Sequence, residues 1–257
     1  MSILADPPRG PWRGPLPALR SAWHIVHLGA LVLAWGLSPS AWRRPWRGAL
    51  AAQVVRAAWP LLAWFTLLAA VLALVIIRIV LVTAQSYGLS QVALEVVVRV
   101  LVIELIPLGA ALAVALRVTL PLAGELAALR RRDALGPDAL RLQIAPRVLA
   151  GVFSVLLTAA VSSAVALVLA YLLAHGFSPW ALPRFTRVVG QVFGPVVALV
   201  FVLKTAALAL AVALMPMGSA LHGRDRDDGI GLEVQGLVRL FVAVLAIEVA
   251  ALAGNYL

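Results

Sequence analysis

Long runs of apolar residues constrain this chain more than any other feature of its sequence. The clearest run, residues 148–174, extends over 27 residues without a charged side chain. A helix of about 20 apolar residues is long enough to cross the hydrocarbon core of a bilayer. Of all 257 residues, 63% are hydrophobic and only 12% are charged, whereas soluble domains are about 25% charged. These features exclude a soluble enzyme, a disordered chain and a secreted disulfide scaffold, and they predict an integral membrane protein.

The sequence predicts an all-α, polytopic fold with five membrane-spanning helices. The expected spans are residues 60–83, 89–124, 148–174, 188–217 and 234–256. The second is too long for a straight crossing, and we expect Pro107 and Pro121 to bend or break it. Before the first span, the short apolar run 22–37 lies among tryptophans and arginines, which favour the lipid headgroup layer. We therefore expect a cytoplasmic and interfacial amphipathic segment over residues 1–58, and a five-span domain over residues 59–257. A short extra span at the apolar run is the alternative.

The arginines between the spans predict how the chain is oriented. Fourteen arginines lie in segments that would share one side of the membrane, and two lie in segments on the other side. Basic loops stay on the cytoplasmic side. We therefore expect a protein of the cell inner membrane whose N-terminus is cytoplasmic and whose C-terminus is periplasmic. A sixth span would put the first arginine cluster outside, which argues against it.

Several enzymatic and metal-binding motifs are missing from the sequence. Lys204 is the only lysine and follows Leu203, so the chain has no P-loop. The chain has no cysteine, and its four histidines form no H-E-x-x-H motif. The basic residues lie between apolar runs rather than on a polar face with stacking aromatics, so we expect no nucleic-acid binding. We expect no enzyme activity, cofactor or metal in this chain, and the energy for uphill transport would come from a partner or an ion gradient.

Charged side chains inside the expected spans are the candidate functional residues. Each costs about 3 kcal/mol on insertion scales, so such residues normally face a cavity, a partner or each other. Glu95 and Arg99 are four residues apart and can pair on one helix. Glu104 lies deeper, and a place in the wall of a substrate cavity is one interpretation of it. Lys204 is close to the middle of its span, where it either pairs with Glu104 or Glu248 or faces a wet cavity. If it faced lipid, replacement by leucine would be tolerated.

Five short motifs occur in order along the spans. They are Glu104-Leu105-Ile106-Pro107, then Arg117 with Glu125-Leu126, then Asp138 with Pro146-Arg147-Val148-Leu149-Ala150, then Leu203-Lys204, and finally Leu245-Ala246-Ile247-Glu248. Their order and spacing resemble the MlaE/YrbE family, in which the matching segments read E-L-G-P, G-R with A-E-[LI]-G, D-P…P-R-[VF]-x-A, I-K-S and L-x-x-D. The resemblance covers roughly residues 50–257. Members of this family are permease subunits of ABC-type lipid transporters that work with MCE proteins.

The chain departs from the family pattern in the segment expected to couple to the ATPase. The family's E-Q-[IL]-x-A-[LM] is reduced here to Arg130-Arg131-Arg132-Asp133-Ala134-Leu135, in a shortened loop. The arginine that precedes the family's glutamate is Ile103 here, and the L-Q-G of the first span is missing. Such a permease couples weakly to its ATPase or forms one half of a heterodimer. We favour the heterodimer modestly over a homodimer.

The resemblance implies a set of partners and site residues. It implies a second permease chain, with the facing first and second spans enclosing a phospholipid-sized cavity. It also implies ABC ATPase subunits that bind ATP and Mg, an MCE-domain protein, and a small STAS-type subunit as an optional regulator. The candidate lipid contacts are Tyr87, Glu95, Arg99, Glu104, Arg117, Lys204 and Glu248. The candidate coupling residues, within residues 125–147, are Arg130, Arg131, Arg132, Asp133, Asp138 and Arg141.

Other interpretations of these features remain. The arginine run 130–132 would also serve as a topology anchor attracted to anionic lipid. A proton-coupled secondary transporter would use the intramembrane carboxylates, but the two halves of the chain carry no inverted repeat. A non-transporting scaffold would be anchored by the tryptophan-rich N-terminus. Neither alternative function accounts for the ordered motifs, so we expect a lipid permease.

Overall fold

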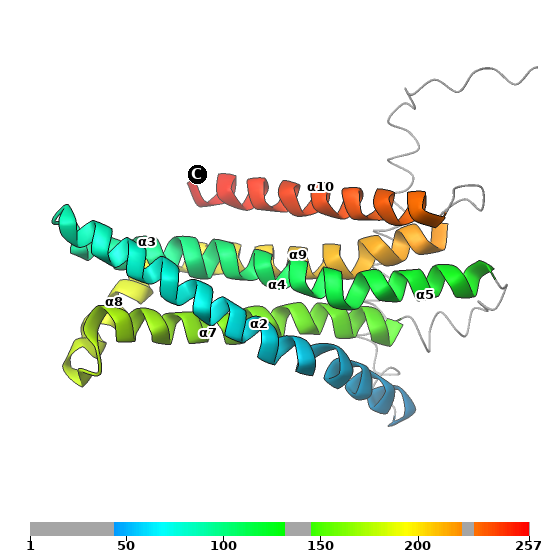
Figure 1. Cartoon of the computed structure of the whole chain (residues 1–257), viewed down its shortest axis with the longest axis horizontal. Helices are drawn as coiled ribbons and strands as arrows, with labels where there is room; N and C mark the ends of the chain where they lie inside the picture. The colour runs from blue at the N-terminus through cyan, green and yellow to red at the C-terminus, as the bar shows by residue number, and fades with distance from the viewer. Residues whose placement is uncertain (1–43, 132–144, 223–228, 257) are drawn as a thin grey trace, which may run out of the picture.

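The described part of the chain is a bundle of long helices. The computed structural model describes residues 44–131, 145–222 and 229–256. Five of its helical segments are long and apolar enough to cross a membrane: Leu50–Ser86, Val92–Leu126, Ala145–His175, Pro195–Gly218 and Gly236–Gly254. They run side by side along the long axis of the molecule (Figure 1). The all-α, five-span prediction is confirmed, while the apolar run 22–37 lies outside the described residues.

The first span belongs to one long helix, α2 (Arg44–Ser86). This helix is continuous through residue 58, where the sequence predicted the change from interfacial segment to span. It packs along α7 (Ala145–His175), which also lies against α4 and α9. The buried positions of α7 are mostly small, which lets neighbouring helices approach closely in a membrane. They include Ala150, Gly151, Ser154, Thr158, Ala159, Ser162, Ser163, Ala166 and Ala170.

The second span alternates between α-helical and π-helical geometry. It consists of α3 (Ser90–Val97), the π-helical stretch Val98–Leu105, α4 (Ile106–Val114), the π-helical stretch Ala115–Thr119 and α5 (Leu120–Arg131). We expected Pro107 and Pro121 to bend or break this span, but the helical backbone continues past both prolines. Each proline is the second residue of an α-helical segment that follows a π-helical stretch. A proline has no N–H to donate, and the widened turn beside it accommodates the lost backbone hydrogen bond.

The fourth span begins later than the sequence predicted. The expected span 188–217 is divided in the structure, because the amphipathic helix α8 (Leu182–Val192) ends before α9 (Pro195–His222) begins. The helix stops at Phe193, whose backbone leaves the helical region, and Pro195 is the first residue of α9. Proline is favoured at the first position of a helix, where its missing N–H costs nothing. The final helix, α10 (Gly229–Tyr256), packs on α9.

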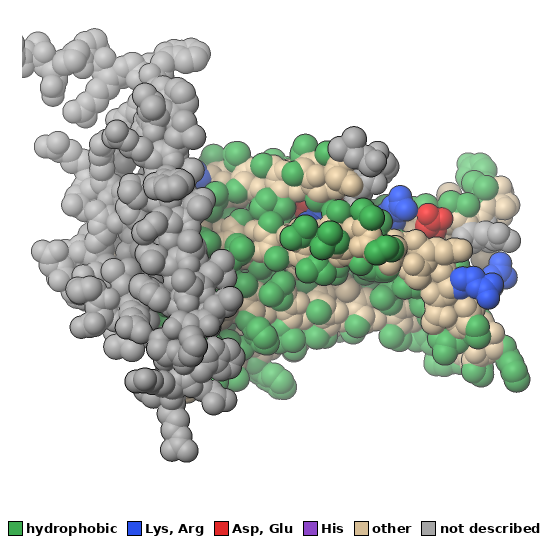
Figure 2. All heavy atoms as spheres, turned by 180° about the vertical axis from the view of Figure 1, so that it is seen from behind, with side chains coloured by type: hydrophobic (Ala, Val, Ile, Leu, Met, Phe, Trp, Pro, Cys, Tyr) green, Lys and Arg blue, Asp and Glu red, His purple; other side chains and the backbone are tan. Residues whose placement is uncertain are grey.

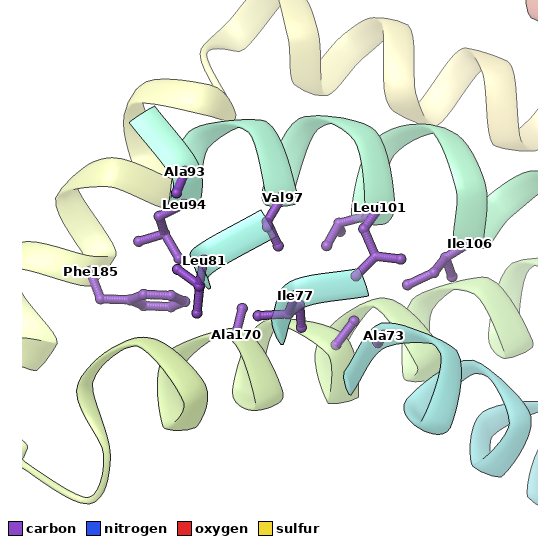
Figure 3. Packing of buried hydrophobic residues seen from close by; sticks show 12 residues of the cluster. Ala73, Ile77, Leu81, Ala93, Leu94, Val97, Leu101, Ile106, Ala170 and Phe185 are labelled. Carbon is purple, nitrogen blue, oxygen red and sulfur yellow. The ribbon is translucent and has the colours of Figure 1, made fainter. Parts of the chain in front are cut away.

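Apolar side chains fill the centre of the bundle and cover its sides. One buried cluster joins the first, second and third spans to α8 through Ala73, Ile77, Leu81, Val97, Leu101, Ile106, Ala170 and Phe185 (Figure 3). Many large apolar side chains are also exposed on the spans, and Figure 2 shows them over the middle of the molecule. A soluble monomer rarely exposes so much apolar surface. Surrounding lipid accounts for it.

Candidate functional site

Three charged side chains from three different spans meet inside the bundle. Lys204 of α9 forms ion pairs with Glu104, in the first π-helical stretch, and with Glu248 of α10. The distance from Lys204 Nζ to Glu248 Oε2 is 2.6 Å. Lys204 is only 3% exposed, so it does not face lipid. The sequence offered either glutamate as a partner, and the structure brings both to the same lysine.

The polar side chains of α9 near this cluster lie on its buried face. On α9, Val202 and Leu203 are exposed, while Lys204 and Thr205 are buried on the opposite side. The Thr205 hydroxyl donates to the backbone carbonyl of Phe201 at 2.7 Å, so it is satisfied within its own helix. Glu104 lies in the last turn of a π-helical stretch, a geometry that is frequent at functional sites.

The electrostatics of the cluster are unbalanced. When all three groups are ionised, one lysine faces two carboxylates. Glu248 Oε1 is buried and has no hydrogen-bond partner among the described residues, although Oε2 of the same side chain pairs with Lys204. Such ion pairs rarely add net stability, because desolvation offsets the attraction. A buried charge cluster inside a membrane span is therefore more easily explained by function than by stability.

Three other predicted contact residues lie apart from this cluster, at the end of the second span. Glu95 and Arg99 form the expected i, i+4 pair, at 3.6 Å between Oε1 and Nη2, with side chains 51% and 44% exposed. Tyr87 is 76% exposed and lies in the tight turn between α2 and α3. Gly88 has a positive φ of 71° there, which a residue with a side chain rarely adopts.

Arg117 lies beside residues from two other helices, α2 and α7. Its guanidinium lies over the ring of Trp64, 4.7 Å from the ring centroid. It also lines a cavity of about 240 Å³ together with Arg56, Arg147 and Glu125. In the sequence, Arg56 and Arg147 both count among the basic residues that predict the orientation, and Arg147 also belongs to one of the five ordered motifs. Both arginines lie near the start of a predicted span. That position is visible in the sequence, but it does not reveal that the first and third spans pack together at this end.

An apolar groove lies between α2 and α7. Its volume is about 400 Å³, and its lining is almost entirely apolar. The lining residues are Leu62, Ala63, Thr66, Leu67, Ala70 and Val161. The first and third spans of one chain form this groove, whereas the expected dimeric cavity lies between the first and second spans of two chains.

The predicted coupling residues are mostly outside the described part of the chain. Arg130 and Arg131 are the last residues of α5. Arg132, Asp133, Asp138 and Arg141 lie in residues 132–144, outside the described residues. Among the residues that the structure does describe, no group of three or more His, Asp or Glu side chains could hold a metal ion.

A multi-pass helical bundle with a buried charge cluster within its spans is typical of membrane transport proteins. Comparison with family profiles identifies the family within that class: the Permease MlaE profile matches residues 50–253. The chain belongs to the MlaE permease family, as the motifs predicted, and is a membrane permease component of a lipid transporter. Such a component is a non-enzymatic subunit that associates with other transporter components. No curated protein matches the chain.

Proposed function

We propose that this chain is the transmembrane permease subunit of an ABC-type phospholipid transporter. Two permease chains, with a heterodimer favoured over a homodimer, enclose the lipid cavity. Separate ATPase subunits bind ATP and Mg and supply the energy, and an MCE-domain protein exchanges lipid with the cavity. A STAS-type subunit is an optional regulator. The observation that carries the proposal is the Lys204 cluster inside a bundle of this family, because it ties the second, fourth and fifth spans together through charges.

The arginine distribution supports the orientation in this proposal. The N-terminus lies in the cytoplasm and the C-terminus in the periplasm, in the inner membrane. The segment between α5 and α7 then lies in the cytoplasm, where an ATPase can reach it. Within the proposed domain of residues 59–257, this segment, residues 125–147, is the coupling loop.

The proposed coupling pathway follows the second span. Displacement of the coupling loop moves α5, which is continuous through α4 with the π-helical stretch that carries Glu104. The same displacement therefore reaches the ion pair between Glu104 and Lys204. Glu104, Lys204 and Glu248 form the polar part of the cavity wall. Tyr87, Glu95 and Arg99 offer polar contacts at the far end of the span, where a headgroup enters or leaves.

The test is lipid transfer by the reconstituted complex. The chain is purified from native membranes with its partners, incorporated into liposomes with a fluorescent phospholipid, and assayed with ATP, without ATP, and with an imposed proton gradient. We expect ATP-dependent transfer that falls strongly in Lys204→Met, and no loss in Arg78→Met, which replaces an exposed charge on α2. Transfer driven by the proton gradient without ATP would indicate a secondary transporter. Co-purification of an ATPase that the chain does not stimulate would indicate a scaffold. Either result would refute the proposal.

A further inference from the structure

A second charged site lies between α2, α5 and α7, separate from the Lys204 cluster. A cavity of about 240 Å³ is lined by three arginines. They are Arg56 of α2, Arg117 of the π-helical stretch Ala115–Thr119, and Arg147 of α7. This volume is several times the roughly 30 Å³ that one water molecule occupies in the liquid. Arg117 is 13 residues from Glu104, or about 20 Å along the second span. The arginine cavity is therefore a different place from the buried ion pairs.

The charges around this cavity are predominantly positive. Glu125 is the only acidic residue in its lining, and its Oε2 lies 3.7 Å from Arg147 Nη1. Arg56 and Arg117 have no carboxylate partner among the described residues, and Arg117 instead lies over Trp64. Three guanidinium groups against one carboxylate leave two positive charges. The guanidinium fork matches the oxygens of a phosphate group, so the cavity suits a phosphate ligand.

The surroundings of the cavity favour a phosphate group that is carried by a lipid. Arg56 is followed by Ala63, Leu67 and Ala70 at spacings of 7, 11 and 14 residues, which places all four on one face of α2. The latter three line the apolar groove of about 400 Å³ between α2 and α7. A headgroup at the arginines therefore has an apolar path beside it for an acyl chain.

The position of the cavity across the membrane agrees with this ligand. Arg78 is the next charged residue on α2, about 33 Å from Arg56 at 1.5 Å per residue. This distance is close to the thickness of the hydrocarbon core, about 30 Å. The two arginines therefore lie at opposite membrane boundaries. Trp59 and Trp64 follow Arg56 on α2 and are both exposed, and tryptophan favours the headgroup layer. Basic pockets between membrane helices at such a boundary bind anionic headgroups.

We propose that Arg56, Arg117 and Arg147 bind the phosphate group of an anionic lipid, whose acyl chain lies in the groove between α2 and α7. The lipid comes from the leaflet at this end of the bundle. The bound lipid contacts α2, the second span and α7, close to the two ends of residues 125–147. Its binding therefore stabilises the packing of α5 and α7. This is a lipid site additional to the transport pathway of the proposed function.

The test is native mass spectrometry of the full-length chain in a neutral detergent. Dioleoylphosphatidylglycerol, dioleoylphosphatidylcholine and inorganic phosphate are titrated separately. We expect the phosphatidylglycerol to bind the unmodified chain more tightly than the phosphatidylcholine does. We expect its affinity to fall about tenfold or more in the double variant Arg56→Gln, Arg117→Gln, since each substitution removes hydrogen bonds from a charged donor to the phosphate. Arg78→Gln removes the same charge from the same helix at the other boundary and serves as the matched control, with unchanged affinity expected.

A further variant separates a ligand site from a merely structural cluster. Glu125→Gln removes the only acidic group of the cavity and frees Arg147, so we expect it to bind phosphatidylglycerol more tightly than the unmodified chain. This variant also tests the proposal if the double arginine variant does not fold. Unchanged or weaker binding in Glu125→Gln would overturn the proposal, as would equal affinity in the arginine variant.

The phosphate titration identifies the source of the ligand. Inorganic phosphate could bind with the same dependence on the arginines and displace the lipid at equal concentration. That result would identify a site for free anions and overturn the lipid assignment. The assay needs neither an ATPase nor an MCE protein. Its failure is therefore distinguishable from a failure of the proposed transport function.

Discussion

Replacing Lys204 by methionine tests whether the three charges depend on one another. Methionine has a similar length and fills the same space without a charge. The change leaves Glu104 and Glu248 facing each other inside the bundle without the cation that joins them. Breaking a buried ion pair by removing one partner costs about 3–5 kcal/mol. From the sequence we expected Lys204→Leu to be tolerated only if the side chain faced lipid. Lys204 is buried, which argues against that outcome.

The measurement is the thermal unfolding of the purified chain in lipid nanodiscs, followed by tryptophan fluorescence. For a chain of this size, 1 kcal/mol shifts the melting temperature by about 2–4 °C, so we expect a decrease on the order of 10 °C. The triple variant Lys204→Met, Glu104→Gln, Glu248→Gln has no charge left in the cluster. It should recover most of the lost stability, because no unpaired charge is then left buried in the bundle.

The control is Arg78→Met, which removes an exposed charge from α2 and should change the free energy of unfolding by less than about 0.5 kcal/mol. A melting temperature of Lys204→Met equal to that of the unmodified chain would refute the reasoning, since the two glutamates would then not need the lysine. A triple variant no more stable than the single one would show that packing, and not charge, is lost.

Three further predictions concern packing between the spans. Gly151→Leu should lower the melting temperature, because a Cβ at this glycine would lie 3.3 Å from the side chain of Thr119 and overpacking costs about 1–3 kcal/mol. Thr66→Ala and Ser162→Ala should show a coupling of about 0.6 kcal/mol in a double-mutant cycle of unfolding, from the hydrogen bond of 3.2 Å between their hydroxyls. Phe185→Ala should destabilise the fold by about 3–5 kcal/mol because it empties the cluster under α8, whereas Phe177→Ala, at an 89% exposed residue, should leave the melting temperature unchanged.

The sequence predicted the number and approximate position of the spans because length and apolarity alone decide whether a helix can cross a membrane. It failed where local geometry competes with apolarity. The sequence pattern extended the fourth span back over residues 188–192, but Phe193 and Gly194 separate them from α9, which begins at Pro195. Pro107 predicted a bend or a break, and the helix continues past it because a π-helical stretch accommodates the missing N–H, which no apolar pattern reveals.

The candidate site was predictable only in part, because a uniformly apolar span does not reveal which of its faces meets a neighbour. Lys204, Glu104 and Glu248 each lie within a predicted span, and a charged side chain there needs a partner or a cavity. That all three meet depends on α9 packing against both α10 and the second span. The arginine cavity was missed for the same reason, because Arg56 and Arg147 are 91 residues apart in the chain and meet only through the packing of α2 and α7.

The π-helical stretch Val98–Leu105 has a consequence for how this span tolerates insertion and deletion. Its hydrogen bonds reach one residue further than those of an α-helix. Deleting one residue there would shorten the crossing by only about 1.5 Å, yet it would rotate one half of the helix against the other by about 100°. The span would still fit its bilayer, while the turn that carries Glu95 would lose its present register with the half that carries Glu104 and Arg117. Membrane thickness thus places little constraint on this stretch, and the register between the two halves that flank it constrains it strictly.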